Sequence, residues 1–349
     1  MTTRTRTSPT PEPAEKPVDS LGRPLHDLRI SVTDRCNFRC TYCMPKEVFG
    51  RAYKFLGRDE LLTFEEITRL ARIFVSLGVV KVRLTGGEPT VRRDLPKLIG
   101  MLREIDGLRD LTLTTNGSRL RELAPALKAS GLHRATVSLD SLDDATFRAM
   151  NDADFPVSLV LDGIEAAREA GFSPVKINVV VKRGVNEDGI VDIVRRFQGP
   201  DYIVRFIEYM DVGTTNGWRM DDVVPAAEIV SRLSEHYLLK PLEPAYRGEV
   251  ARRFELPDGG EVGIIASVTQ PFCGDCTRAR LSADGKLYTC LFAFRGHDLR
   301  TLLRSDKSDE EITGFLRGTW AKRDDRYSEL RTESTPGSPP KVEMSYIGG

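Results

Sequence analysis

Short runs of apolar and β-branched residues recur between about residue 28 and residue 210, mostly at intervals of about thirty residues. Runs that are apolar nearly throughout are typical of parallel strands buried on both faces. We therefore predict six strands. They are LRISV (28–32), VKVRLT (80–85), LTLTT (111–115), ATVSL (135–139), VKINVVV (175–181) and YIVRFIE (202–208).

Amphipathic segments with recognisable ends lie between these runs. In TFEEITRLARIFVSLG, Thr63 and Glu66 have the spacing of a capping box, and Gly78 is placed to end the helix. The segments 119–130 and 159–170 repeat the pattern, and each is followed by glycine. Six strand–helix units predict an incomplete parallel α/β barrel, a (βα)6 variant of the TIM barrel. A doubly wound sheet is the alternative, because periodicity does not distinguish the two folds.

The chain is predicted to have three parts. Residues 1–20 are rich in Thr, Pro and Glu without an apolar run, which predicts a disordered extension rather than a secretory signal. Residues 21–225 form the barrel. Residues 226–349 form a C-terminal domain, which begins with a helix at 226–237 and continues in strands punctuated by Pro and Gly. No run approaches the roughly 20 apolar residues that span a bilayer, so we expect a cytoplasmic protein with no membrane partner.

The charge balance limits the partners. The chain has 51 basic and 51 acidic residues and a formal net charge of zero. Proteins that bind nucleic acids or membrane surfaces show a basic excess, so neither partner is expected. Individually placed arginines must therefore meet any anionic ligand. No GxxxxGK[ST] segment is present, which excludes a P-loop nucleotide site.

The six cysteines form two groups of three that lie far apart in the sequence. Disulfides are not expected, because the cytosol keeps thiols reduced. Three thiolates suit a [4Fe–4S] cluster, which otherwise takes four, and leave one iron without a protein ligand. The first triad is Cys36, Cys40 and Cys43, spaced C-x3-C-x2-C, and the second is Cys273, Cys276 and Cys290, spaced C-x2-C-x13-C.

The first triad directly follows the first predicted strand, at the end of a barrel where active sites lie. A structural zinc site is the alternative, but zinc normally takes four ligands, and no fourth is nearby in the sequence. With Tyr42 before its last cysteine, the triad resembles the signature of the radical S-adenosylmethionine superfamily. This resemblance implies that the open iron binds S-adenosylmethionine, whose reductive cleavage gives a 5′-deoxyadenosyl radical.

The segment TGGEP (85–89), after the second strand, resembles the glycine-rich motif of the same superfamily. Gly86 and Gly87 would let a ligand approach the backbone closely. Gly-Gly-acid segments are common in turns, so the assignment to this motif depends on the position of the segment directly after a strand. Ser138, at the end of the fourth strand, is placed to contact a ribose.

The second triad has a more credible alternative, since C-x-x-C is half of a zinc ribbon and His297 could complete the site. A second [4Fe–4S] cluster with an open iron is the preferred interpretation. Arg278 and Arg280 follow the cysteine pair, and a forked guanidinium binds phosphate through two hydrogen bonds. A solvated strand face is the ordinary interpretation of such a pair, but its position beside a cluster favours phosphate binding.

Taken in order, several motifs resemble one family, the GTP 3′,8-cyclases of molybdenum-cofactor biosynthesis. The resemblance spans about residues 21–349 and implies two [4Fe–4S] clusters, one at each end of a shared cavity. It also implies that the adenosyl radical removes the ribose 3′ hydrogen of GTP, after which C3′ bonds to C8 of guanine. The motifs are CNFRCTYC, VRLTGGEP, LTTNG, VSLD, RFIEYMDVG, CxxCTRARLSADGKLYTCLF, RDDRYSE and the terminal YIGG.

The same resemblance implies roles for individual residues. A structural ion pair is the alternative for Arg29, Arg83 and Lys176, which lie within or beside buried strands. S-adenosylmethionine contacts are assigned to Tyr42, Gly87, Ser138 and Met210. GTP contacts are assigned to Arg29, Arg83, Thr114, Lys176, Thr277, Arg278 and Arg280, of which Arg29, Arg278 and Arg280 are also expected to be catalytic.

The resemblance also implies partners and a role for the tail. The partners are GTP, S-adenosylmethionine, an external electron donor, a following pathway enzyme and a second copy in a homodimer. Gly348 and Gly349 are expected to enter the active site, although a frayed terminus is the ordinary interpretation of two final glycines.

Three other functions compete with this interpretation. A peptide-modifying radical S-adenosylmethionine enzyme usually has more C-terminal cysteines. An iron–sulfur electron carrier needs closed four-cysteine sites. A zinc-binding nucleic-acid module is opposed by the charge balance.

Overall fold

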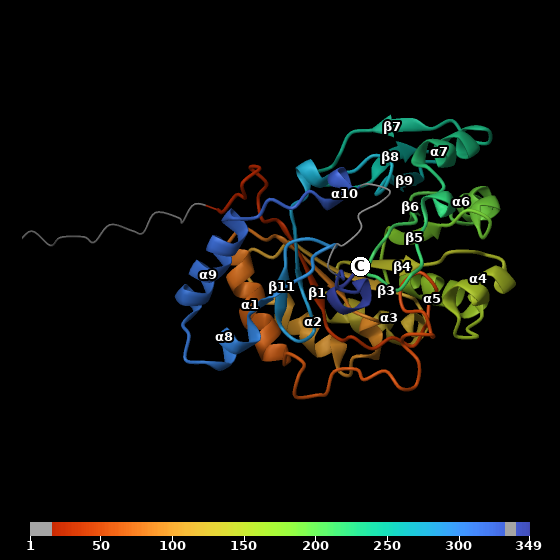
Figure 1. The fold of residues 1–349 in the computed structure, drawn as a ribbon. Coiled ribbons are helices and arrows are strands. Elements are labelled where there is room, and N and C mark those ends of the chain that lie inside the picture. The colour runs from red at the N-terminus through yellow and green to blue at the C-terminus, as the bar shows by residue number, and fades with distance from the viewer. Residues whose placement is uncertain (1–15, 332–339) are drawn as a thin grey trace, which may run out of the picture.

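The computed structural model describes residues 16–331 and 340–349. A 12-stranded sheet curves through the molecule, and helices cover its outer face (Figure 1). The strands are β1 (Asp27–Ser31), β2 (Lys81–Thr85), β3 (Asp110–Thr115), β4 (Arg134–Ser138), β5 (Val175–Val181), β6 (Tyr202–Glu208), β7 (Lys240–Leu242), β8 (Arg252–Glu255), β9 (Glu261–Ile265), β10 (Arg278–Leu281), β11 (Lys286–Tyr288) and β12 (His297–Asp298). The α-helices are α1 (Phe64–Ser76), α2 (Leu95–Arg103), α3 (Leu120–Ala129), α4 (Asp144–Asn151), α5 (Val157–Glu169), α6 (Ile190–Arg196), α7 (Ala226–Ser234), α8 (Arg300–Arg304), α9 (Asp309–Ala321), α10 (Tyr327–Leu330) and α11 (Met344–Ile347).

The six predicted strands lie side by side in chain order and are parallel. The doubly wound alternative is wrong, because such a sheet reverses its strand order at a switch point. Two later strands extend the parallel array, β10 beside β1 and β9 beside β6. The sheet order ends at β7 and β12, which do not pair with each other. The predicted incomplete barrel is therefore confirmed. Strands from both sides of the predicted boundary at residue 225 belong to one continuous sheet.

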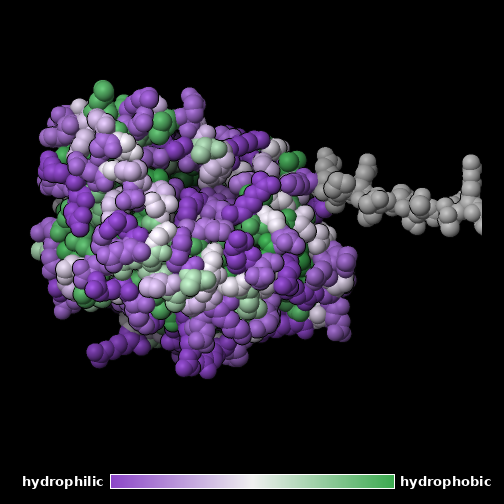
Figure 2. Space-filling view, turned by 180° about the vertical axis from the view of Figure 1, so that it is seen from behind, coloured by the Kyte–Doolittle hydropathy of each residue, from purple (hydrophilic) through white to green (hydrophobic). Residues whose placement is uncertain are grey.

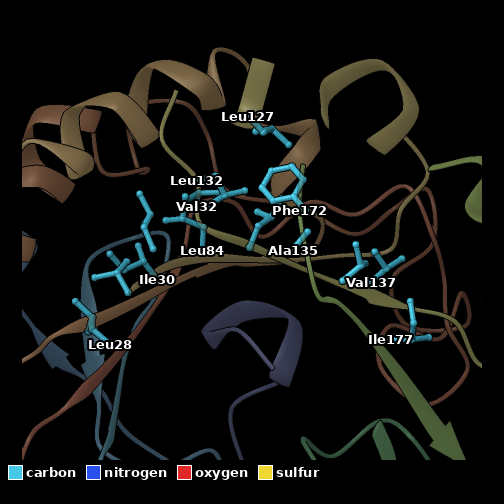
Figure 3. Packing of buried hydrophobic residues seen from close by; sticks show 14 of the residues in the cluster. Leu28, Ile30, Val32, Leu84, Leu127, Leu132, Ala135, Val137, Phe172 and Ile177 are labelled. Carbon is cyan, nitrogen blue, oxygen red and sulfur yellow. The ribbon is translucent and has the colours of Figure 1, made fainter. Parts of the chain in front are cut away.

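Side chains of the barrel strands alternate between two environments. Leu28, Ile30 and Leu84 are fully buried between the sheet and the outer helices (Figure 3). Their neighbours Arg29 and Arg83 face the concave side, because successive residues of a strand point to opposite faces. The prediction of strands buried on both faces is therefore confirmed, but only the outer face is apolar. The inner face carries polar and charged side chains that surround a cavity.

The caps of the outer helices follow the sequence signals. Thr63 Oγ1 accepts a hydrogen bond from the Glu66 amide at 3.1 Å, and the Glu66 carboxylate accepts one from the Thr63 amide at 2.8 Å. Gly78 has a φ of 113°, a conformation that favours glycine just past the helix. The capping box and helix end predicted for α1 are confirmed. The helices predicted at 119–130, 159–170 and 226–237 correspond to α3, α5 and α7.

Part of the predicted N-terminal extension, residues 16–20, lies among the described residues. Residues 1–15 lie outside the described residues. Asp19, however, is buried, and its carboxylate pairs with Arg23 at 2.6 Å and with Arg323 at 2.9 Å. Val18 forms a β-bridge with Pro24. Residues 16–20 therefore belong to the fold, as a link between its first strand and its C-terminal part.

The end of the chain lies inside the curve of the sheet. The short helix α11 sits on the concave side, opposite the face that packs against the outer helices (Figure 3). Ile347 is fully buried, and Gly349 lines the central cavity. The predicted entry of the tail into the interior is confirmed. No helix of residues 16–331 and 340–349 is long and apolar enough to cross a membrane.

Candidate active site

A cavity of about 280 Å³ occupies the concave side of the sheet, and both cysteine triads line it. The first triad follows the carboxyl end of β1, whereas Cys276 precedes the amino end of β10 by two residues. Because β10 and β1 are parallel neighbours, these ends lie at opposite mouths of the barrel. Two groups of three thiols therefore face one another across a single cavity.

The loop of the first triad is held by its backbone neighbours. Arg39 donates from Nη1 to the carbonyl oxygen of Cys36 at 2.8 Å. A Cβ at Gly86 or Gly87 would collide with the carbonyl oxygens of Thr33 or Arg35, respectively. The close approach that the two glycines permit is thus to the cysteine loop itself. Both glycines also line the cavity, so the approach of a ligand to their backbone stays a prediction beside this packing.

Tyr42 is anchored at the carboxyl ends of the next strands. Its hydroxyl donates to Asp140 Oδ2 at 2.7 Å, and the Val180 amide donates to Asp140 Oδ1 at 2.9 Å. Burial raises the pKa of Asp140 to about 6. The cavity wall also includes Gly87, Ser138 and Met210. The four residues assigned to S-adenosylmethionine are thus gathered at the mouth that holds the first triad.

Arginines form a row on the inner face of the sheet. Arg29 on β1 lies in register between Arg280 on β10 and Arg83 on β2. Burial lowers the pKa of Arg29, and repulsion from Arg280 lowers it further. Arg83 donates to the hydroxyls of Thr114 at 2.8 Å and Thr136 at 3.1 Å.

Within the described ranges neither Arg29 nor Arg83 forms an ion pair, so the ion-pair alternative does not hold for them. A buried positive charge without a carboxylate is costly. A row of such charges on one wall suits a polyanionic ligand that would neutralise them.

Arg278 contacts the second triad directly. Its Nε and Nη2 lie 3.4 and 3.3 Å from Cys276 Sγ, and its guanidinium stacks 5.0 Å above the Phe272 ring. Burial alone would raise the pKa of Cys276, but Arg278 and Arg323 outweigh it and lower the pKa to about 6. A thiolate, the form that binds metal, is therefore favoured at this position.

At Cys36 and Cys290 burial outweighs the effect of the nearby cations, Arg39 and Arg280 respectively, on the thiol pKa. Burial raises the pKa of Cys36 to about 12 and that of Cys290 to about 11. All six cysteines are free thiols that face the cavity. Buried thiols of high pKa fit iron ligands, since bound iron supplies the positive charge that deprotonates them. The donor set at both mouths therefore fits [4Fe–4S] clusters.

The zinc alternative for the second triad fails on geometry. His297 lies on β12, is exposed, and packs edge-on against Phe315 with ring centroids 6.1 Å apart. It is not part of the cavity wall. In the part of the chain that the structure describes, no group of three or more His, Cys, Asp or Glu is arranged to hold a single metal ion.

The C-terminal tail contributes Met344, Ser345 and Gly349 to the cavity wall. Arg280 Nη1 donates a hydrogen bond to the carbonyl oxygen of Gly348. Upstream, Lys341 Nζ pairs with Asp211 Oδ2 at 2.8 Å, and Glu343 Oε1 accepts a hydrogen bond from the Thr214 amide at 2.9 Å. These contacts fix the tail on the residues that follow β6.

Two relatives are similar to this protein over nearly the full chain. It is 54% identical over 356 residues to the GTP 3′,8-cyclase of Acidothermus cellulolyticus, covering 95% of this chain and 98% of the relative. It is 48% identical over 339 residues to the GTP 3′,8-cyclase of Staphylococcus saprophyticus, covering 96% and 99%. The chain belongs to the GTP 3′,8-cyclase family.

Two family models agree with membership of this family, and a solved structure shares the fold. The Radical SAM superfamily model matches residues 30–197, and the Molybdenum Cofactor Synthesis C model matches residues 202–329. The SuiB protein of Streptococcus suis bound to S-adenosylmethionine aligns with a TM-score of 0.55 and 16% identity, covering 84% of this chain and 68% of that chain. At this identity the likeness shows the fold alone.

Two of the residues expected to contact GTP lie off the cavity wall. Thr277 is fully buried and packs closely against Gly248, where an added Cβ would lie only 2.6 Å from the Thr277 Oγ1. Lys176 lies in register with Thr136, on the face of β5 from which Asn178 reaches the cavity. Burial lowers the pKa of Lys176 to about 7, and Arg205 adds to the effect. The other predicted site residues all line the cavity.

Sequence reasoning about this family member missed Arg205 and Asn178. Both line the cavity, and Arg205 Nε and Asn178 Oδ1 are buried without a hydrogen-bond partner in the described residues. Burial lowers the pKa of Arg205 to about 9, and Arg83 adds to the effect. The signal was available, since Arg205 is the one basic residue of the YIVRFIE strand.

Proposed function

We propose that this chain converts GTP to (8S)-3′,8-cyclo-7,8-dihydroguanosine 5′-triphosphate, the first step of molybdenum-cofactor biosynthesis, in the cytoplasm. The observation that carries the proposal is the pair of cysteine triads facing one cavity whose wall bears unpaired arginines. A carrier of electrons alone would not need this wall of cations.

The first triad would hold a [4Fe–4S] cluster that supplies, with S-adenosylmethionine, the 5′-deoxyadenosyl radical that takes the ribose 3′ hydrogen of GTP. Tyr42, Gly87, Ser138 and Met210 would orient S-adenosylmethionine at this mouth. Asp140 would fix the Tyr42 ring through its hydroxyl.

The second triad would hold a second cluster at the opposite mouth, with its open iron toward the purine. Arg29, Arg83, Arg205 and Arg280 would bind the triphosphate, and Arg278 would do so beside Cys276. Binding the anion would relieve the repulsion within the arginine row, so the wall contributes affinity that a neutral nucleoside lacks. The tail would exclude water from the reacting atoms.

Several partners belong to the same proposal. An external donor would supply two electrons for each product: one is consumed by S-adenosylmethionine cleavage, and the other, with a proton, reduces the radical left on the guanine ring when C3′ bonds to C8. The product would pass to the next enzyme of the pathway, and the chain would act as a homodimer.

Two measurements on anaerobically purified protein test the proposal. We expect about eight iron and about eight sulfide per chain, the content of two clusters. Incubation with GTP, S-adenosylmethionine and dithionite should give the cyclised triphosphate and 5′-deoxyadenosine. Zinc with little iron, or intact GTP beside complete clusters, would overturn it.

A further inference from the structure

The connection between β1 and α1 carries an unpaired positive charge. It runs as a long red-orange loop along the lower edge of the molecule in Figure 1. Residues 44–58 contain four basic residues and one acidic residue, a net charge of +3 in a chain whose total is zero. Arg51, Lys54 and Arg58 are exposed and form no ion pair or hydrogen bond within residues 16–331 and 340–349.

The same loop exposes apolar surface among these charges. Val48 and Tyr53 are 44% and 40% exposed. The Tyr53 ring packs between those of Phe49 and Phe55, with centroids 4.7 and 4.8 Å apart. Tyrosine and arginine around an apolar centre are the composition of protein-binding surfaces. Figure 2 shows one face of the molecule, which is mostly hydrophilic with scattered apolar spots.

This surface lies directly outside the first triad. The loop begins one residue after Cys43, and the Met44 amide donates to the Cys40 carbonyl at 2.9 Å. Arg39 joins the loop to the first triad, since it donates from Nη1 to Cys36 O at 2.8 Å and from Nε to Phe49 O at 2.9 Å. The triad thus has the substrate cavity on one side and this loop on the other.

We propose that residues 44–58 form the docking surface for an acidic one-electron carrier protein. The inference rests on the proposed function, in which each S-adenosylmethionine cleavage takes one electron and reduction of the ring radical takes a second. The carrier is oxidised by one electron and the cluster of the first triad is reduced by the same electron, so the transfer balances. Opposite charge steers such a carrier to the loop, and the exposed Tyr53 and Val48 supply the apolar contact.

The test uses the full chain and a flavodoxin of net negative charge as the probe. Arg51→Glu with Lys54→Glu should raise the flavodoxin Kd about tenfold at low ionic strength. Arg51→Gln with Lys54→Gln should fall between this variant and wild type. The difference should vanish at about 1 M salt, where the Debye length is about 3 Å. Binding is measured by titration without turnover.

A second readout separates docking from catalysis. The charge-reversed variant should form 5′-deoxyadenosine at the wild-type rate with dithionite and more slowly with reduced flavodoxin. Arg72→Glu with Arg121→Glu, on the exposed surfaces of α1 and α3, is the matched control and should change neither rate.

An unchanged Kd in the charge-reversed variant would overturn the proposal, as would an equal loss in the control. Tighter binding of short duplex DNA than of flavodoxin at this loop would assign the surface to nucleic acid and also overturn it. A wild-type protein that makes no product with dithionite would instead contradict the proposed function, because the binding titration does not depend on turnover.

Discussion

Arg280 donates a hydrogen bond to the backbone carbonyl oxygen of Gly348, the penultimate residue of the chain. A guanidinium from the wall assigned to GTP is thus in contact with the chain terminus. Gly348 has a φ of 78°, and a Cβ there would collide with Thr85. The backbone at this point therefore needs a residue without a side chain. The tail is part of the site rather than a frayed end.

We expect Gly348→Ala, or deletion of Gly348 and Gly349, to block cyclisation while leaving folding and iron content intact. The added methyl group would force the tail away from Thr85 and Arg280. Gly314→Ala, in the exposed part of α9 with nothing within 4 Å, is the matched control. Cyclised product and iron are measured in one preparation. Full activity of the Gly348 variant would return the tail to a passive role.

Arg280→Ala or Arg278→Ala should weaken GTP binding about 10- to 150-fold, since charge-assisted hydrogen bonds contribute about 1.5–3 kcal/mol each. S-adenosylmethionine binding should change little, because its expected contacts lie at the other mouth of the cavity. Equilibrium titrations of both ligands measure the effect. If guanosine and GTP bind the wild type equally well, phosphate recognition is the wrong role.

Arg29→Met should separate stability from binding. Arg29 lies between two other guanidiniums without an ion pair in the described residues, so removing its charge relieves repulsion. We expect the free energy of unfolding without ligand to rise by about 1 kcal/mol and GTP affinity to fall. Thermal unfolding and GTP titration of the same variant measure the two effects. A destabilised variant would show that Arg29 is structurally paired after all.

Lys176 should make GTP binding depend on pH. Its pKa in the folded protein is about 7 because of burial and of Arg205 nearby. The charged amine that attracts phosphate is therefore lost as pH rises through about 7. GTP affinity should fall above this pH. The part of the fall that is due to Lys176 should be absent in Lys176→Met, whereas any part that is due to ionisation of GTP itself should remain.

The same group makes stability depend on pH in the opposite sense. Between about 7 and the ordinary lysine value of 10.5, the unfolded state binds more protons at this position than the folded state. The contribution of Lys176 to stability therefore rises with pH across that window and reaches its minimum below it. Urea unfolding at several pH values, compared with Lys176→Met, measures this contribution.

The two triads should fail in different ways. Cys40→Ala should abolish 5′-deoxyadenosine formation under reducing, anaerobic conditions, because S-adenosylmethionine is expected to bind only at the first triad. Cys276→Ala should retain some S-adenosylmethionine cleavage but form no cyclised GTP. Both products are quantified from one reaction. Normal 5′-deoxyadenosine from the Cys40 variant would refute the assignment of the first triad.

The sequence predicted the barrel strands well because each carries an outward row of Leu, Ile and Val. It did not show that the inner row is polar, since Arg29 and Arg83 look like interruptions until the curvature of the sheet places them around a cavity. Arg205 was missed for the same reason. Arg205 is recognised as a site residue only when the curvature of the sheet brings β6 to the same cavity as β1 and β2, which are far from it in the sequence.

The C-terminal strands were the least predictable part of the fold. The strands β9 and β10 extend the parallel array, yet β10 is only four residues long and pairs with β1 from the other end of the chain. Local patterns do not encode such pairings. Asp19 was assigned to a disordered segment, but its contact with Arg323, 304 residues away, ties it to the fold. The spacing of the cysteines located the two triads and drew attention to Arg278 and Arg280, whereas resemblance to the family, rather than periodicity, assigned roles to Arg29 and Arg83.

Transfer of a labelled hydrogen tests the central claim most directly. The account places GTP between the two triads, with its ribose within reach of a radical formed at the first. With GTP deuterated at C3′, the 5′-deoxyadenosine formed by the anaerobic enzyme should carry the deuterium, as read by mass spectrometry. Unlabelled 5′-deoxyadenosine formed together with cyclised product would contradict hydrogen abstraction from C3′ and with it the account of this cavity.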